Sequence, residues 1–159
     1  MVVRRSIPIT AQGLERLRTE LAELKQRRRT AAQQIQQVRE DSPGARDEGE
    51  GEETKIEQAF IEGRIREIEA VIDSAELIDE EKAHASDVVR LGSTVTVRPT
   101  RRRKDFTYTI VGPTEVDPAN GRVSDESPVG QALLGARVGD TVEVNAPNGL
   151  LKLKVKAIE

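Results

Sequence analysis

The first half of the chain carries a repeating pattern of apolar residues that predicts a long amphipathic helix. Positions spaced alternately three and four residues apart form a heptad seam with one charge in it: Leu14, Leu17, Leu21, Leu24, Arg28, Ala31, Ile35 and Val38. Thr10 is a suitable N-cap, and Ile9 before it is placed to pack onto the first turn. The seam predicts a helix over residues 11–40, roughly 45 Å long at 1.5 Å per residue.

A second apolar seam with the same spacing lies further along the chain. It consists of Ile61, Ile65, Ile68, Ile72 and Ala75, extended upstream by Ile56 or Phe60 and downstream by Ile78. The segment between the seams contains Pro43 and Gly44, followed by Gly49 and Gly51, which favour turns. Since these residues do not belong at the centre of one continuous helix, we expect an antiparallel helical hairpin in which each seam buries the other.

Beyond residue 86 the pattern changes to an alternation of polar and apolar residues, which is typical of half-buried strands. The alternation covers residues 93–97, 106–111, 140–144 and 151–155, with Gly, Pro and Asn turns between them. Residues 128–134 are a short apolar segment that we expect to form one or two helical turns against the sheet. The predicted fold class is α followed by α+β: an N-terminal coiled-coil hairpin in residues 1–80, and a small β-rich domain in residues 81–159.

The composition excludes several classes of protein. Only Phe60, Phe106 and Tyr108 are aromatic, which excludes a large aromatic-lined pocket and the binding of single strands by ring stacking. The chain has no cysteine, so disulfides, thiolate metal sites and a cysteine nucleophile are excluded. Its one histidine, His84, gives no histidine metal cluster and little general-base chemistry. We assign His84 no function, and we do not expect an enzyme.

The chain carries no signal that directs it to a membrane. No apolar run approaches the roughly 20 residues that span a bilayer, and the first residues lack the apolar stretch of a signal peptide. Because the two seams of the hairpin satisfy each other, we also expect a monomer. The sequence thus predicts a soluble cytoplasmic monomer with no membrane partner.

Acidic residues gather at the turn of the predicted hairpin, although the net charge of the whole chain is only −3. Residues 40–53, which we call the acidic tip, hold seven acids and one base, Arg46. One interpretation is a solvated loop. The other is that carboxylates present oxygen ligands to Mg²⁺ or Mn²⁺ held by another protein, and the stiff arm that carries them favours this interpretation. The candidate residues are Asp41, Asp47, Glu48 and Glu50.

Two basic clusters each allow a structural and a functional interpretation. Arg27, Arg28 and Arg29 lie on the first predicted helix. They either pair with acids of the second helix or contact the phosphates of a single-stranded nucleic acid. Residues 101–104 (RRRK) fall between two predicted strands, where an exposed charged hairpin loop is the favoured interpretation.

Three segments resemble the bacterial Gre transcript-cleavage factors. Residues 10–24 (TAQGLERLRTELAEL) are similar to the opening signature of that family. Residues 124–134 (SDESPVGQALL), followed by Gly139 and Asp140, are similar to its second signature. Residues 62–65 (EGRI) and 72–75 (IDSA) resemble the second helix of the family's hairpin. The resemblance covers nearly the whole chain in the same order, which exceeds what chance agreement produces.

The resemblance implies a specific function. Gre factors bind bacterial RNA polymerase through an FKBP-like C-terminal domain at the rim of the secondary channel, and they insert their coiled coil into that channel. Their tip carboxylates help to hold the second Mg²⁺ of the polymerase and stimulate hydrolysis of backtracked RNA. A basic patch on the coiled coil steadies the end of the nascent RNA. The factor contributes no cofactor or metal of its own.

The resemblance also assigns roles to residues of this chain by position. Arg28 and Arg29 match the basic patch of the family. Ser124, Ser127 and Pro128 fall in the segment that resembles the polymerase-docking region. The sequence thus predicts two contact regions, one on the hairpin for RNA and one on the C-terminal domain for the polymerase.

The tip departs from the family pattern, which has an Asp followed three residues later by a Glu. Counting back from the second helix places Gly44 at the Asp position and Asp47 at the Glu position. Counting forward from the first helix places Pro43 and Arg46 there instead. Misplacing a catalytic group by about 1 Å can cost roughly 10²-fold in rate. We therefore expect the chain to inhibit or modulate the polymerase, as family members with altered acidic tips do, rather than to stimulate cleavage efficiently.

Three alternatives remain open at this point. The chain is a genuine cleavage factor that rescues backtracked polymerase, a coiled-coil adaptor whose acids have no metal-directed role, or a nucleic-acid-binding protein that acts alone. The acidic charge balance and the lack of an aromatic platform argue against the last of these.

Overall fold

The computed structural model describes residues 5–41 and 48–159, with side chains at 5–41 and 54–159. The chain forms two compact units. One is Leu14–Ser74, and the other combines Met1–Gly13 with Ala75–Glu159. This division differs from the predicted boundary at residue 80, because the N-terminal segment pairs as a strand with residues 75–77. The predicted fold class, a helical hairpin followed by a β-rich domain, is confirmed.

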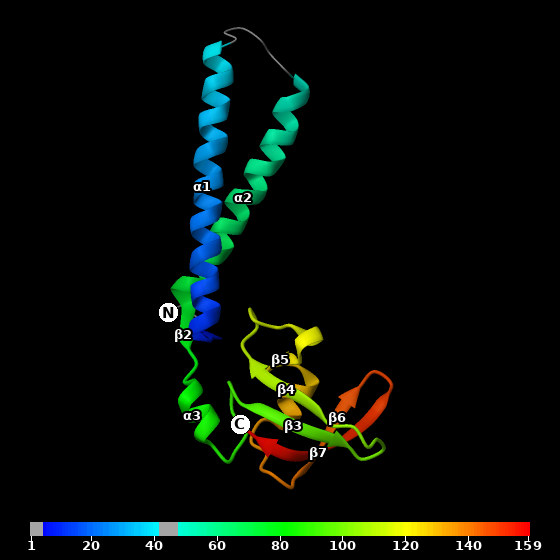
Figure 1. Cartoon of the computed structure of the whole chain (residues 1–159). Helices are drawn as coiled ribbons and strands as arrows, with labels where there is room; N and C mark the ends of the chain where they lie inside the picture. The colour runs from blue at the N-terminus through cyan, green and yellow to red at the C-terminus, as the bar shows by residue number, and fades with distance from the viewer. Residues whose placement is uncertain (1–4, 42–47) are drawn as a thin grey trace. The chain divides into compact units, whose positions relative to one another are not determined.

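Two long antiparallel helices form a hairpin that we call the arm (Figure 1): α1, Ala11–Asp41, and α2, Glu48–Ser74. Thr10 caps α1 as predicted, because the Gly13 N–H donates to Thr10 Oγ1 over 3.0 Å. The two predicted seams meet in a small apolar core, whose buried and half-buried members are Leu17, Leu21, Leu24, Ile61, Ile65, Ile68 and Ile72. The heptad pattern therefore identified the contact between the helices.

The apolar contact between the helices does not reach the distal end of the arm. Val38 is 62% exposed, Ile56 71% and Phe60 68%. Figure 1 shows α1 and α2 diverging toward the ends at Asp41 and Glu48. The prediction that Ile56 or Phe60 extends the second seam is therefore wrong. Neither lies three or four residues from buried Ile61, so both side chains point away from the seam.

Short elements join the N-terminal segment to the second unit. β1, Ile7–Ile9, runs parallel to β2, Ala75–Leu77. The Ile78 N–H extends this pairing by donating to the Ile9 carbonyl over 2.9 Å. α3, Glu80–Ala85, follows and is capped by Asp79. The first residues of the chain thus belong structurally with residues far along the sequence.

A five-stranded sheet in the order β5-β4-β3-β7-β6 forms the body of the second unit. Its strands are β3, Thr94–Pro99, β4, Phe106–Val111, β5, Arg122–Ser124, β6, Thr141–Ala146, and β7, Gly149–Ile158. β4 and β5 are parallel, and all other neighbours are antiparallel. A 3₁₀ turn, η1, Pro118–Asn120, precedes β5, and α4, Pro128–Leu133, lies between β5 and β6 in the chain.

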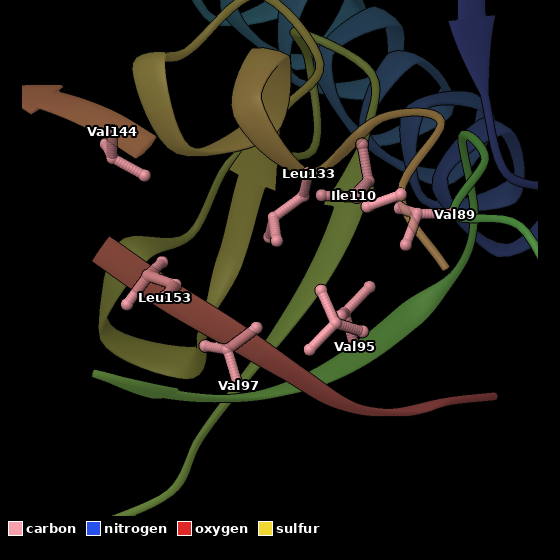
Figure 2. Close-up of a cluster of buried hydrophobic side chains, with 9 residues drawn as sticks. Val89, Val95, Val97, Ile110, Leu133, Val144 and Leu153 are labelled. Carbon is pink, nitrogen blue, oxygen red and sulfur yellow. The ribbon is translucent and has the colours of Figure 1, made fainter. Parts of the chain in front are cut away.

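The core of this unit lies on one face of the sheet (Figure 2). Alternate residues of β3 and β7 point toward it, and α4 contributes a side chain from above them. The buried members are Val89, Val95, Val97, Ile110, Leu133, Ala136, Val144, Leu153 and Val155. The residues of β3 between the buried valines, Thr94, Thr96 and Arg98, turn polar side chains to the opposite face.

The alternation of polar and apolar residues located the longer strands correctly. The segments predicted at 93–97, 106–111, 140–144 and 151–155 are confirmed as β3, β4, β6 and β7. The short helix predicted at 128–134 is confirmed as α4, and residues 101–104 form the predicted exposed loop between β3 and β4. The three-residue strands β1, β2 and β5 and the six-residue helix α3 were not predicted.

Candidate functional site

The distal end of the arm carries the residues predicted to act on a metal. α1 ends at Asp41 and α2 begins at Glu48. The Asp41 carboxylate is exposed and accepts hydrogen bonds from Gln37 Nε2 at 3.2 and 3.1 Å. Asp47 lies outside the described residues, and Glu48 and Glu50 belong to α2 by their backbone, with their side chains outside the described part.

The helix dipole does not account for Asp41. The N-terminus of a helix carries a partial positive charge, which favours negative residues there. Asp41 lies at the opposite pole, the C-terminus of α1, where a negative charge is unfavourable. The helix dipole therefore does not explain why an acid occupies position 41.

The arginine cluster on α1 faces the acids of α2. Arg27 Nη2 lies 3.1 Å from Glu57 Oε1, and Arg28 Nη1 lies 3.2 Å from Glu62 Oε1. Arg29 is exposed and forms no ion pair with any residue that the structure describes. The structural interpretation, pairing across the hairpin, is thus confirmed for the first two arginines.

These pairs do not exclude contact with a phosphate. The side chains of Arg27 and Arg28 are 56% and 45% exposed, and exposed ion pairs contribute only about 0–1 kcal/mol. A phosphate could therefore displace either carboxylate at little cost. The interpretation that these arginines contact the phosphates of a single-stranded nucleic acid stays a prediction.

A bidentate ion pair, which the sequence did not reveal, crosses the base of the arm. Arg64 Nε and Nη2 donate to the two carboxylate oxygens of Glu20 at 2.8 and 3.0 Å, and Arg64 Nη1 donates to Glu67 at 3.0 Å. The guanidinium holds the pKa of Glu20 below its ordinary value. Because both donors of the fork engage one carboxylate, this pair fixes the register of α1 against α2.

The segment predicted to dock on a partner forms a tightly hydrogen-bonded turn. Ser127 caps α4: its Oγ accepts from the Gly130 N–H at 3.1 Å and donates to the Ser124 carbonyl at 2.6 Å. Ser124 Oγ accepts from the Glu126 N–H at 3.0 Å. Pro128 is exposed at the first position of α4. Both serines therefore have a structural role, and their docking role stays a prediction.

Glu115 is a further residue that the sequence did not single out. Its side chain is only 5% exposed and receives hydrogen bonds from the Thr10 N–H at 2.8 Å, from Thr10 Oγ1, and from Arg122 Nη2 at 3.4 Å. Nearby, a Cβ on Gly112 would lie 1.8 Å from the Pro8 carbonyl oxygen, so that position requires glycine. These contacts attach the N-terminal segment to the sheet.

His84 lines a small polar cavity of about 220 Å³ in the second unit. The lining residues are Thr10, Gln12, Glu80, His84, Gly92, Thr94, Thr109, Val111 and Arg122. Their charges are of both signs, and Arg122 is already paired with Glu115. We assign this cavity no ligand.

The part of the chain that the structure describes contains neither a cluster of metal-ligating side chains nor a helix suited to span a membrane. There, no three side chains of His, Cys, Asp or Glu converge on a point where they could hold a metal ion. Likewise, none of the described helices is both long and apolar enough to span a bilayer.

Both halves of the chain match known protein families. Residues 7–77 match the family described as transcription elongation factor, N-terminal, and residues 83–159 match transcription elongation factor, GreA/GreB, C-term. The chain is 45% identical to a transcription elongation factor GreA of Thermomicrobium roseum, over 99% of this chain and 100% of that protein. It is also 45% identical to a GreA of Thermoanaerobacter pseudethanolicus, over 94% and 95% of the two chains.

Two solved structures are also similar to the chain. The GreA factor homolog 1 of Thermus thermophilus is 31% identical, with 98% of this chain and 99% of that chain covered and a TM-score of 0.45. The corresponding protein of Thermus aquaticus is 34% identical with the same coverage and TM-score.

Proposed function

Because the chain belongs to the GreA/GreB family of transcription elongation factors, we propose that it regulates elongation by binding bacterial RNA polymerase at the secondary channel. The observation that carries the proposal is the arm, a hairpin of two long helices with acidic residues at its turn. The family consists of transcription factors, and the chain is not itself an enzyme. We place it in the cytoplasm, as a monomer, where the polymerase works.

The dimensions of the arm support insertion into a channel. α1 has 31 residues and is therefore about 46 Å long at 1.5 Å per residue. The apolar core around Leu24 and Ile65 and the paired Arg64 and Glu20 hold its base together. A rigid base supports the two helices that lead to the acidic tip.

Attachment to the polymerase is assigned to the turn before α4. Ser124, Ser127 and Pro128 match the docking segment of the family by position. Ser127 Oγ donates to the Ser124 carbonyl and accepts from the Gly130 N–H, and these two hydrogen bonds fix the shape of the turn. A partner would therefore meet a preorganised surface.

The acidic tip supplies the chemistry at the polymerase. Carboxylate oxygens are ligands that Mg²⁺ prefers, and Asp41, exposed at the end of α1, has the chemistry to approach the Mg²⁺ of the polymerase. Asp47, Glu48 and Glu50 are assigned the same role. We propose that the tip inhibits or modulates elongation, because neither alignment of the tip restores the pair of carboxylates that cleavage factors carry.

The arginines of the arm are assigned to the nascent RNA. Arg29 is exposed, and Arg27 and Arg28 are held only by exposed ion pairs. A phosphate group could therefore be bound by Arg29 directly and by the other two in exchange for their carboxylates.

A second candidate function is efficient stimulation of transcript cleavage. It is favoured by the 45% identity to proteins named GreA over almost the whole chain, which exceeds the 31–34% identity to the two GreA factor homologs. This candidate function requires Asp47 and another acid of the tip to replace the Asp and Glu carboxylates that cleavage factors of the family carry.

Elongation assays with purified bacterial RNA polymerase test the proposal. The chain should slow nucleotide addition, and neutralising the tip as Asp47→Ala, Glu48→Ala and Glu50→Ala together should abolish that effect without abolishing binding. Glu23→Ala neutralises one exposed acid of α1 outside the tip and serves as a control that should act as the wild type does. An adaptor without a metal-directed role would keep its full effect after the tip is neutralised, and a chain that fails to bind polymerase contradicts the whole proposal.

A further inference from the structure

Basic residues are concentrated on part of the second unit. Residues 98–105 and 149–156 together hold eight basic residues and one acid, whereas the whole chain has a net charge of −3. These two segments are neighbours in the sheet, because Arg98 of β3 pairs with Lys154 of β7. The positive charge is therefore concentrated on one part of the molecule.

The register of the strands places the basic side chains on the face opposite the core. Along β7, exposed Lys152, Lys154 and Lys156 alternate with buried Leu153 and Val155. Successive lysines are thus about 6.8 Å apart along the strand. Together with Arg98 on the neighbouring strand, about 4.8 Å away, they form an open row on the sheet.

The loop between β3 and β4 extends this row. The Thr100 N–H donates to the Lys152 carbonyl over 3.1 Å, so the loop leaves the sheet beside β7. Arg101, Arg102 and Arg103 follow and are all exposed. We call this surface the cationic face; its members are Arg98, Arg101, Arg102, Arg103, Lys152, Lys154 and Lys156.

Little of this charge is neutralised by neighbouring acids. Asp105 accepts from Arg98 Nε at 2.6 Å, and Glu143 lies 4.0 Å from Lys152. The Arg98 hydrogen bond lowers the pKa of the Asp105 carboxyl, and Lys156 adds a smaller effect in the same direction. Lys154 and the three loop arginines form no ion pair with any residue in the described ranges. A surface with this excess of positive charge matches a densely charged polyanion.

The absence of aromatic rings on this face selects the kind of polyanion. Phe106 and Tyr108 pack against the core cluster, on the opposite side of the sheet, and the remaining aromatic residue, Phe60, belongs to α2. Binding of single strands relies on bases stacking on aromatic side chains, whereas a duplex presents its phosphates outward and needs no such platform. A basic face without rings therefore fits a duplex.

We propose that the cationic face binds the phosphate backbone of double-stranded DNA without sequence preference. The face is distinct from the turn at Ser124 to Pro128, since that turn follows β5 and the cationic residues lie on β3, on β7 and in the loop between β3 and β4. The proposal does not depend on the action of the acidic tip. It gives the C-terminal unit a nucleic-acid contact in addition to its assigned docking segment.

Fluorescence anisotropy of the full chain with a labelled mixed-sequence DNA duplex, over a series of salt concentrations, tests the proposal. Binding should weaken steeply with salt. The variant Lys152→Gln/Lys154→Gln should bind the duplex more weakly. Its plot of log K against log salt concentration should be shallower by about 1.8, because each of the two lost phosphate contacts contributes about 0.9 to the slope. Lys82→Gln/Arg90→Gln, an equal charge change at exposed positions off the cationic face, is the matched control and should keep the wild-type slope.

A second variant avoids any change to a strand. Arg101→Gln/Arg103→Gln alters only the exposed loop, so it should leave the fold intact and weaken duplex binding in the same way. The proposal is overturned if the wild type shows no salt-dependent duplex binding, or if the control loses as much affinity as the two variants. It is equally overturned if replacing Arg27, Arg28 and Arg29 together by Gln abolishes all duplex binding.

Competition distinguishes the polyanions. A single-stranded RNA of the same length should compete less well than unlabelled duplex, and polyglutamate should compete least, because it lacks phosphates. Stronger competition by the RNA, or by polyglutamate, would contradict the assignment to duplex DNA and would point to a single strand or to an acidic protein surface respectively.

Discussion

Glu115 caps the first turn of α1 through Thr10, a residue 105 positions earlier in the chain. One carboxylate oxygen accepts from the Thr10 N–H at 2.8 Å, and the other accepts from Thr10 Oγ1. Thr10 Oγ1 in turn accepts from the Gly13 N–H at 3.0 Å. The cap of the helix is thus held by a buried acid from the C-terminal part of the sequence.

Replacing Glu115 by Gln should destabilise the second unit. The amide keeps one acceptor oxygen but places an NH₂ group against the Thr10 donors, and a buried polar group left without its partner costs about 1–3 kcal/mol. Urea unfolding of the full chain measures the change. Glu126→Gln, which changes the same kind of group at an exposed position, should alter the unfolding free energy by no more than about 0.5 kcal/mol, and an equal loss in both variants would contradict the role of Glu115.

Two glycines of the arm should respond in opposite directions to alanine. A Cβ on Gly13 would lie 2.2 Å from Glu115 Oε1, so Gly13→Ala should destabilise the chain despite the better helix propensity of alanine. Gly63 has open space around it, so Gly63→Ala should stabilise α2 by about 0.5–1 kcal/mol.

Thermal unfolding of both variants checks this pair of expectations. Adding Glu115→Ala to Gly13→Ala should recover part of the loss, because the clash is with the Glu115 side chain. If both glycine substitutions stabilise the chain, the close approach of Gly13 to Glu115 does not exist in solution.

The pair of Arg64 and Glu20 should make the stability of the arm depend on pH. Arg64 holds the pKa of Glu20 below its ordinary value of 4.5, so its contribution is present above that value and is lost as the pH falls through the lowered pKa. The contribution should be below about 1 kcal/mol, because both side chains are partly exposed to solvent.

The difference in unfolding free energy between the wild type and Arg64→Gln is the quantity to measure. It should shrink as the pH is lowered below about 4.5, since protonated Glu20 gains little from the guanidinium. Arg66→Gln, an exposed arginine of the same helix, should show no such trend. A difference for Arg64→Gln that stays constant down to acidic pH would contradict the assignment.

Neighbouring apolar residues of α2 should differ sharply in their importance. Ile61 is 2% exposed and packs in the core of the arm, so Ile61→Ala should cost about 2–4 kcal/mol. Phe60 is 68% exposed, so Phe60→Ala should change the stability by less than about 0.5 kcal/mol. Urea unfolding of both variants tests this, and a large loss for Phe60→Ala would show that the distal helices are packed together.

The sequence predicted the parts of the fold in which periodicity extends over many residues. The heptad seam found the contact of Leu24 with Ile61, Ile65 and Ile68, and the alternation of residues found the four longer strands. It failed for Phe60, which directly precedes buried Ile61 and whose side chain is therefore turned away from the seam and is 68% exposed. The strands β1, β2 and β5 were missed because three residues are too few to show an alternation.

The candidate site was predicted only in part, for a physical reason. Charge clusters such as Arg27 to Arg29 are visible in a sequence, and their pairing with Glu57 and Glu62 follows from the hairpin. Glu115 is one acid without neighbouring signals, and its role depends on a contact across 105 residues. Likewise, the charge of the cationic face emerges only when β3 and β7 are placed side by side.

The length of the RNA 3′ end in backtracked RNA polymerase complexes, measured with and without the purified chain, tests the central proposal most directly. We expect RNA shortening little faster than with polymerase alone, together with slower elongation that neutralising Asp47, Glu48 and Glu50 relieves. Rapid shortening that Asp47→Ala abolishes would contradict an inhibitory or modulating tip and would identify the chain as an efficient cleavage factor.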